Sequence, residues 1–109
     1  MTFANDRPLT LINVFTVEPT DQQRLIELLA TATGRSVRHA PGFVSARLHR
    51  SLDGTKVAMY AQWRSAADYE AMRADPAPLP YLRQALAIAR FEPGMYEVVG
   101  TFEPGTREA

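Results

Sequence analysis

Hydrophobic and polar residues alternate strictly over Lys56–Arg64, KVAMYAQWR, which is the pattern of a β-strand with two different faces. One face carries four side chains: Val57, Met59, Ala61 and Trp63. The other face carries three: Ala58, Tyr60 and Gln62. Trp63 is the only tryptophan of the chain, and Ser65 follows it in the position of a helix N-cap. We expect this strand, which ends in an indole, to form one wall of a ligand pocket.

Three other stretches show strand patterns: Leu9–Val17, Phe43–Arg50 and Met95–Glu103. The first is largely apolar on both faces, which predicts that both are buried. Its two faces carry, respectively, Leu11, Asn13 and Phe15, and Ile12, Val14 and Thr16. Asn13 would then be a polar group in the interior, where it needs a protein partner or a ligand.

The second stretch is expected to pair with the central strand. Asp53-Gly54, which lies between them, is a strong signal for a tight hairpin turn, so the two strands should be antiparallel neighbours. Alternation along the second strand places four residues on one face: Phe43, Ser45, Arg47 and His49. The opposite face then carries Val44, Ala46 and Leu48.

Helical spacing of apolar residues predicts three helices, at about Asp21–Arg38, Ser65–Asp75 and Leu79–Ala89. Thr20 and Gln23 form a T-x-x-Q capping box at the start of the first helix. Ser65 opens the second with an S-x-x-D pattern, and Pro80 is accommodated in the first turn of the third.

The order β-α-β-β-α-α-β indicates an α+β fold of the ferredoxin-like, split βαβ type, with a four-stranded antiparallel sheet and helices on one face. We expect a single domain over 9–104, a flexible N-terminal arm over 1–8 and a flexible tail over 105–109. The uncovered face would carry Ile12, Val14, Ala58 and Tyr60. An apolar face of this size is unusual on a soluble monomer, so we expect a second copy to cover it in a homodimer.

Composition narrows the classes of partner and compartment. The chain of 109 residues has a formal net charge of zero and no basic cluster, which argues against nucleic acid and anionic membranes as partners. It has no cysteine, which excludes disulfides, thiolate catalysis and iron–sulfur clusters. No apolar run approaches the roughly 20 residues of a membrane span, and the opening MTFANDRP lacks the apolar region of a signal peptide. We expect a cytoplasmic protein.

Common catalytic and nucleotide-binding motifs are absent from the chain. It contains no G-x-G-x-x-G, P-loop, H-E-x-x-H or nucleophile elbow. His39 and His49 lack metal-ligand spacing, and no acidic cluster completes a metal site, so both are interpreted as surface or rim residues.

Four polar or aromatic residues are candidates for chemistry, and each has a structural alternative. Trp63 is either a core residue or a donor, through its N–H, to a substrate carbonyl or to dioxygen. Arg83, beside the apolar stripe of the third helix, is either solvated or directed inward to stabilise an anion. Tyr69 either packs in the core or binds a phenolic oxygen. Asn13 either bonds a neighbouring side chain or contacts a ligand.

Three stretches resemble the antibiotic biosynthesis monooxygenase family: Pro41–Thr55 (PGFVSARLHRSLDGT), Tyr60–Trp63 (YAQW) and Tyr81–Leu86 (YLRQAL). The likeness extends from about Leu9 to Pro104 and points to the small monooxygenases of actinorhodin-type polyketide pathways. It implies a dimeric α+β barrel that oxidises aromatic anthrones or hydroquinones to quinones with dioxygen. It also implies that no metal, flavin or other cofactor is used.

The same resemblance implies roles for individual residues. Trp63 and Tyr69 match a pocket tryptophan and tyrosine of the family, and Arg83 matches an arginine placed to act on the substrate. We assign these three to catalysis. The family has an asparagine four residues before the tryptophan, where this chain has Met59. Four residues are expected to contact the substrate: Asn13, Phe15, Met59 and Leu82.

Two alternatives accompany this hypothesis. One is a non-catalytic or accessory dimeric α+β barrel that binds an unknown apolar ligand, since a fold does not determine a function. The other is the related haem-degrading branch, which has an asparagine on the first strand, as Asn13 is here. That branch needs a histidine about ten residues after the tryptophan, where this chain has Arg73, so haem ligation is disfavoured.

Overall fold

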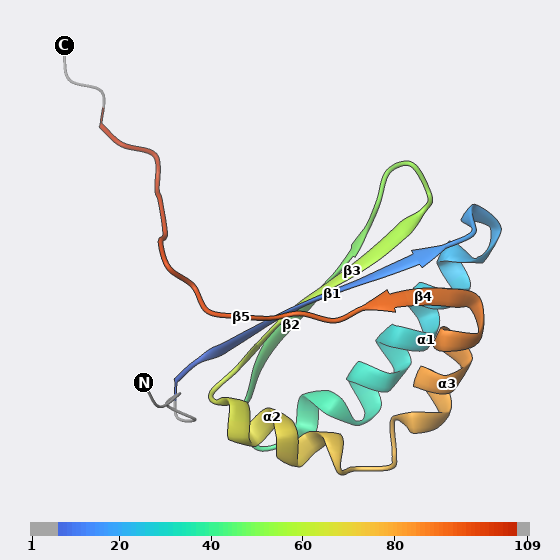
Figure 1. Ribbon diagram of the computed structural model, residues 1–109, viewed down its shortest axis with the longest axis horizontal. Helices are drawn as coiled ribbons and strands as arrows, with labels where there is room; N and C mark the ends of the chain where they lie inside the picture. Colours follow the sequence, from blue (N-terminus) through green and yellow to red (C-terminus); the bar gives the residue numbers. More distant parts are fainter. Residues whose placement is uncertain (1–6, 107–109) are drawn as a thin grey trace.

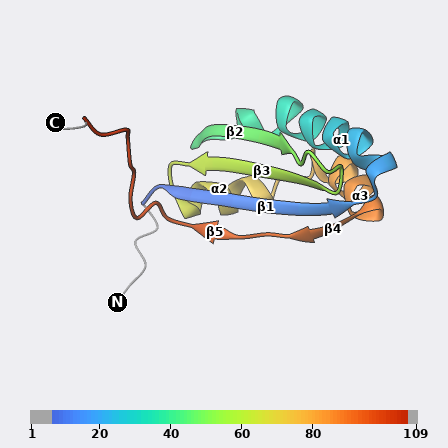
Figure 2. The same cartoon turned by 90° about the horizontal axis from the view of Figure 1, so that it is seen from above.

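Five strands form one antiparallel sheet in the computed structural model, which describes residues 7–106 (Figure 1). They are β1 (Leu9–Val17), β2 (Phe43–Arg50), β3 (Lys56–Trp63), β4 (Ala89–Glu92) and β5 (Met95–Tyr96). The order across the sheet is β2-β3-β1-β4, and β5 pairs with the earlier part of β1. β4 and β5 therefore follow one another along the same edge of β1 (Figure 2).

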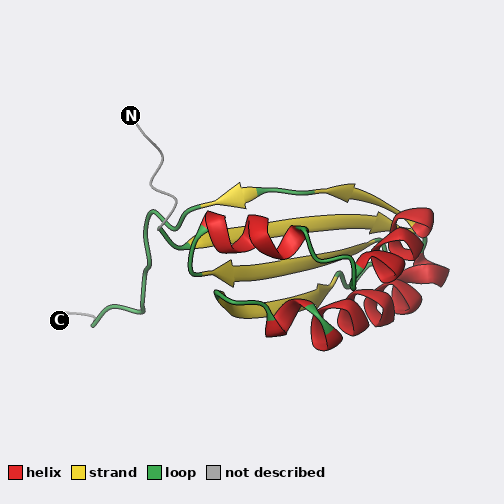
Figure 3. Cartoon of the chain, turned by 90° about the horizontal axis from the view of Figure 1, so that it is seen from below, coloured by secondary structure: helices red, strands yellow, loops and turns green. Residues whose placement is uncertain are grey.

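Three helices cover one face of the sheet: α1 (Gln22–Arg35), α2 (Ala66–Arg73) and α3 (Leu79–Ile88) (Figure 3). Two 3-10 turns, η1 (Pro19–Asp21) and η2 (Val37–His39), flank α1. β3 lies between β1 and β2 and is antiparallel to both, which is the split βαβ arrangement. The predicted α+β, ferredoxin-like fold class is confirmed.

The predicted last strand, Met95–Glu103, begins where β5 begins but runs past its end, and β4 was not predicted. Pairing with β1 begins at Ala89, directly after α3, and the last paired residue among those described is Tyr96. Pro93-Gly94 separates β4 from β5, because proline lacks the N–H that a continuous ladder needs. The sheet therefore has five strands where four were expected, because two short strands, β4 and β5, pair in succession with the same edge of β1.

The start and end of the first helix also differ from the prediction. The T-x-x-Q capping box does not form: Thr20 lies within η1, and the N-cap Asp21 makes no side-chain capping bond. Gln23 instead accepts a hydrogen bond from Arg50 on β2. The helix ends at Arg35, and η2 follows in place of the predicted last turn.

Phe43 lies on the opposite face of the sheet from the one that strict alternation predicts. The register between β2 and β3 shifts between Phe43 and Ser45, so Val44 is an extra residue in the ladder. Phe43 then pairs with Trp63 and joins the helix-covered face, whereas Ser45 pairs with Gln62 on the other face. A bulge of this kind leaves no sign in the hydrophobic pattern of a short strand.

The hydrophobic core lies between the sheet and the helices in two clusters. One centres on Phe15, Leu25 and Val57, and the other on Leu11 and Trp63. The opposite face of the sheet has no helix over it in Figure 1. Its central residues are only partly buried: Ile12, Val14, Ala58 and Tyr60. The predicted division of the sheet into a covered and an uncovered face is therefore present in the single chain.

The proposed domain boundaries stay a prediction. Residues 1–6 of the expected arm and 107–109 of the expected tail lie outside the residues that the structure describes. Over residues 7–106, no helix has the length and apolar character needed to cross a membrane.

Candidate functional site

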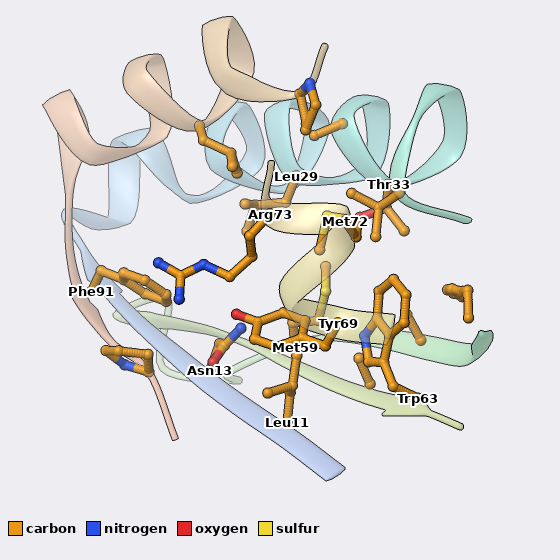
Figure 4. Close-up of a pocket in the computed structure, with 18 of the residues that line it drawn as sticks. Leu11, Asn13, Leu29, Thr33, Met59, Trp63, Tyr69, Met72, Arg73 and Phe91 are labelled. Atoms are coloured by element: carbon orange, nitrogen blue, oxygen red, sulfur yellow. The ribbon is translucent and has the colours of Figure 1, made fainter. Parts of the chain in front are cut away.

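A cavity of about 570 Å³ lies between the covered face of the sheet and the three helices (Figure 4). This size is within the range of pockets that bind small organic ligands. Its walls are mostly apolar, with contributions from β1, β3 and β4, all three helices and the chain between β4 and β5. Of the described residues that line it, Arg73 and Asp75 carry charge.

The floor of the cavity follows from alternation on β1 and β3. Leu11, Asn13 and Phe15 point to the helices from β1, and Met59, Ala61 and Trp63 do so from β3. Asn13 and Met59 are direct partners across the two strands. An amide and a thioether therefore lie side by side at the centre of an otherwise apolar floor.

Trp63 forms one end of the cavity and is only 1% exposed. Its ring packs edge-to-face against Phe43 at 5.5 Å and against Tyr69 at 5.8 Å between centroids. Figure 4 shows the indole nitrogen on the side of the ring that faces Met59 and Tyr69. The structure therefore combines the two interpretations of Trp63, since it is a packed core residue whose polar atom faces the cavity.

The turn between β3 and α2 positions Tyr69, and the predicted N-cap of this helix is confirmed. Ser65 Oγ accepts a hydrogen bond from the Asp68 backbone N–H at 3.2 Å and donates to Asp68 Oδ2 at 2.9 Å. Arg64 Nε donates to Asp68 Oδ2 at 2.8 Å, and this bond lowers the pKa of Asp68 below its usual value. Gly42, with a φ of +87°, packs so closely on Asp68 that a side chain at this position would collide with it.

Tyr69 lies one turn into α2 and faces the cavity with Trp63 (Figure 4). Burial raises the pKa of its hydroxyl, while the positive charge of Arg73 acts in the opposite direction. The hydroxyl therefore keeps its proton at neutral pH and can donate a hydrogen bond to a ligand oxygen. Arg73 lies over the Tyr69 ring, with Cζ 5.9 Å from the centroid.

Asn13 directs its amide nitrogen toward the cavity (Figure 4). Its Oδ1 accepts a hydrogen bond from the backbone N–H of Gly94 at 3.4 Å, between β4 and β5. The oxygen is thereby held by the backbone, which leaves the NH2 group as the donor for a ligand. Phe91 stacks on Phe15 at 4.7 Å between centroids and covers this end of the cavity.

Six of the seven predicted site residues line this one cavity: Asn13, Phe15, Met59, Trp63, Tyr69 and Leu82. The seventh, Arg83, is exposed on α3 and is not among the lining residues, so the expectation that it points inward is wrong. Leu82 and Leu86 occupy the inward face of that helix instead. Arg73 is the arginine that lines the cavity.

Sequence reasoning missed two lining residues that carried a usable signal. Arg73 is four residues after Tyr69, and this spacing places both on one face of α2. Phe91 belongs to the short alternating stretch ARFE of β4, which begins at the last residue of the predicted third helix and otherwise lies outside the predicted elements. Both signals depend on the exact bounds of the elements, which the hydrophobic pattern does not define.

The two histidines stay away from the cavity. His39 and His49 are exposed, and neither lines it. Over residues 7–106, no three metal-ligating side chains gather at one place. The charged side chains among the described lining residues are one cation, Arg73, and one carboxylate, Asp75.

Comparison with known proteins relates this chain to monooxygenases. A family model described as antibiotic biosynthesis monooxygenase matches residues 8–79. The chain is 46% identical to tetracenomycin-F1 monooxygenase of Streptomyces glaucescens over 93 residues. This matched region covers 85% of this chain and 83% of that protein.

Two solved structures share the fold over nearly the whole chain. The monooxygenase of the gene ActVA-Orf6 of Streptomyces coelicolor, in complex with nanaomycin D, has a TM-score of 0.79 and 28% identity, over 94% of this chain and 96% of its own. SnoaB of Streptomyces nogalater, described as a cofactor-independent oxygenase, has a TM-score of 0.73 and 25% identity, over 90% and 99% of the two chains.

Proposed function

Because the chain belongs to the antibiotic biosynthesis monooxygenase family, we propose that it oxidises an aromatic polyketide-type anthrone or hydroquinone to a quinone with dioxygen. The expectation of a monooxygenase is confirmed by the family and by relatives that are monooxygenases of antibiotic biosynthesis. The substrate class, the quinone product, the absence of a cofactor and a cytoplasmic location are parts of the proposal.

One observation carries the proposal: three hydrogen-bond donors from three elements converge on an apolar cavity. They are the Asn13 amide on β1, the Trp63 indole on β3 and the Tyr69 hydroxyl on α2. Mostly apolar walls suit fused aromatic rings, and the donors suit the oxygen atoms at the edges of those rings. SnoaB, which shares this fold, is described as a cofactor-independent oxygenase. This supports a reaction in which the substrate itself, and no cofactor, passes an electron to dioxygen.

The reaction starts from an electron-rich anion of the substrate. Ground-state dioxygen is a triplet, so it reacts with a closed-shell molecule only after one electron has passed to it. An anthrone anion can supply that electron, and the resulting carbon radical and superoxide combine to form a C–O bond. Loss of the remaining C–H proton then breaks the O–O bond. One oxygen atom becomes the new carbonyl, and the other leaves as water. A hydroquinone takes the same route only if oxygen enters at a ring carbon, which gives a hydroxyquinone and water, because loss of its two hydroxyl hydrogens alone would reduce dioxygen to hydrogen peroxide.

The protein holds the anion away from bulk water and stabilises charge on its oxygens. The Trp63 N–H and the Tyr69 hydroxyl donate to the carbonyl and phenolic oxygens, and each such donor lowers the barrier by about 3 kcal/mol. Met59 stands where the family resemblance has an asparagine, and Asn13 is its partner on the neighbouring strand. We assign to Asn13 the donor function that an amide at position 59 would have.

A homodimer is part of the same proposal. The uncovered face of the sheet is apolar at its centre, and two exposed segments border it: the tip of the β2–β3 hairpin with Leu52, and the chain after β5 with Phe102. Figure 1 shows both segments on the side of the sheet away from the helices. Phe102 is 94% exposed in the single chain, which supports a second copy as the cover of this face.

Oxygen uptake tests the proposed function. Protein treated to remove metals and flavin is offered a panel of anthrones and hydroquinones, with uptake recorded beside the absorbance of the quinone. We expect uptake and quinone formation to rise together with enzyme concentration for at least one anthrone. Activity that appears only after flavin or metal is added contradicts the cofactor-free reaction. No uptake above the buffer rate on any member of the panel contradicts the substrate class.

A further inference from the structure

We propose that Arg73 is the residue that binds the ionised oxygen of the substrate, and that Arg83 has no part in this. The inference rests on the proposed function and deepens it, because it assigns the substrate an acidic phenol or enol that is bound as its anion. Among the described residues that line the cavity, Arg73 alone is positively charged. Figure 4 shows its guanidinium group directed into the cavity, toward Phe91.

The position of Arg73 follows from the face of α2 that covers the sheet. Tyr69, Met72 and Arg73 are spaced three and four residues apart, and all three line the cavity. The guanidinium carbon lies 5.9 Å from the centre of the Tyr69 ring, which orients the side chain along the cavity wall. The same ring that faces the substrate therefore also supports the cation.

The guanidinium N–H groups of Arg73 are available to a ligand, because their ion pair with Glu70 is long and exposed. The nearest carboxylate, Oε2 of Glu70, is 3.8 Å away, and the two side chains are 62% and 57% exposed. A pair this long and this exposed is worth little, because water screens it. Binding a ligand anion at Arg73 therefore does not require a strong internal pair to be broken.

The other charged groups near Arg73 define where an anion fits. Glu70 lies beside it on α2, and Asp75 lines the cavity from the chain after the helix. The Asp75 carboxylate accepts a hydrogen bond from the Ala77 backbone N–H at 3.0 Å, which fixes its place. Toward Trp63 the lining residues are uncharged. The substrate anion therefore places its charged oxygen at Arg73 and its rings on the apolar floor.

A ligand pair that differs by one ionisable group tests this assignment without turnover. The probes are 2-hydroxyanthraquinone, which forms a phenolate, and its methyl ether, which cannot. Binding is followed by quenching of the fluorescence of Trp63, the only tryptophan of the chain. We expect the affinity of wild type for the hydroxy probe to rise as pH passes the phenol's pKa, and the affinity for the ether to stay constant.

The two arginines form a matched pair of variants. Both side chains are exposed, so Arg73→Gln and Arg83→Gln should fold alike. Arg73→Gln is expected to lose affinity for the phenolate about tenfold, which is the scale of one hydrogen bond to a charged group. It should bind the ether as wild type does. Arg83→Gln should match wild type with both probes.

Two outcomes overturn the assignment: equal phenolate binding by wild type and Arg73→Gln, or a loss of phenolate affinity in Arg83→Gln alone.

Turnover gives an independent check, since Arg73→Gln should lose rate most at low pH and recover partly at high pH. Arg73→Lys should restore part of the affinity. If wild type binds the phenolate through Arg73 but oxidises no anthrone, the proposed function fails while the binding role of Arg73 stands.

Discussion

The two faces of the sheet are made by the same strands, yet only one of them lines the cavity between sheet and helices. On β1, Asn13 and Phe15 point to the helices and line the cavity, while Ile12 and Val14 point the other way and stay partly exposed. The alternation of side chains along a strand assigns the two sets to opposite faces, but it does not show which face lines a cavity. The difference arises from what covers each face: three helices on one side, and none of the described helices on the other.

The covered and the uncovered face of the sheet suit two different roles, ligand binding and assembly. A covered face with polar donors among apolar side chains encloses a small volume that can exclude water and orient a ligand. An uncovered apolar face is large and open, and it suits a surface of matching shape, such as a second copy. Changes on the covered face should therefore alter chemistry, and changes on the uncovered face should alter assembly.

Trp63→Phe should have the largest effect, and it acts on the covered face. Loss of the indole N–H should lower turnover on the order of a hundredfold. The smaller ring should also cost on the order of 1–2 kcal/mol of stability, because it leaves a void. Steady-state kinetics and thermal melting measure the two effects separately.

Leu25→Val is the matched control for that loss of stability. Leu25 is fully buried in the core and does not line the cavity. It should melt earlier than wild type and keep its turnover. If both variants lose activity in proportion to their stability, Trp63 is a packing residue and its N–H takes no part in the reaction.

Val14→Glu should have the next largest effect, on the uncovered face. A carboxylate in the centre of a two-fold interface meets its own copy, and burial of these like charges should weaken the dimer by about tenfold or more. Sedimentation velocity should show dimeric wild type and a shift toward monomer in the variant. Monomeric wild type at micromolar concentration would contradict the assignment of this face.

Ser65→Ala should cost about 1 kcal/mol, since it removes the cap that sets α2 over the cavity. Thr20→Ala is the matched control, because the cap predicted at Thr20 makes no capping bond. It should change stability by less than about 0.5 kcal/mol. Chemical denaturation of the two variants compares them directly, and equal losses would refute this view of α2.

Asp53→Asn should have the smallest effect, in the hairpin turn away from both faces. Hydrogen bonds from the Thr55 hydroxyl, the Thr55 backbone N–H and the Ser51 hydroxyl lower the pKa of Asp53 from 3.8 to about 2. A lowered folded-state pKa means that the carboxylate stabilises the fold above about pH 4, and that this contribution is lost as pH falls toward 2. The melting temperatures of wild type and variant should differ slightly at pH 7 and converge near pH 2.

The sequence predicts the covered face well because period-two alternation determines which residues point inward. It groups Asn13 with Phe15 on one strand and Met59 with Trp63 on another, and all four line one cavity. Alternation fails where the ladder is irregular, at the bulge that turns Phe43 inward. It also fails at β4, where pairing starts directly after a helix.

The choice of arginine cannot be made from the sequence. Both Arg73 and Arg83 lie beside apolar stripes of short helices, and helical spacing alone does not tell which arginine borders the cavity. Which arginine borders the cavity depends on how α2 packs against β3 and how α3 packs against α1. The family resemblance favours Arg83, and the cavity favours Arg73.

The fate of the two oxygen atoms of dioxygen tests whether this protein catalyses a monooxygenase reaction. Metal- and flavin-free protein is given an anthrone that it oxidises under ¹⁸O₂, and the quinone is analysed by mass spectrometry against a Trp63→Phe control. We expect one ¹⁸O atom in each quinone formed, with the second recovered in water. Unlabelled quinone, or hydrogen peroxide produced in equal amount to quinone, would contradict a monooxygenase reaction in this cavity.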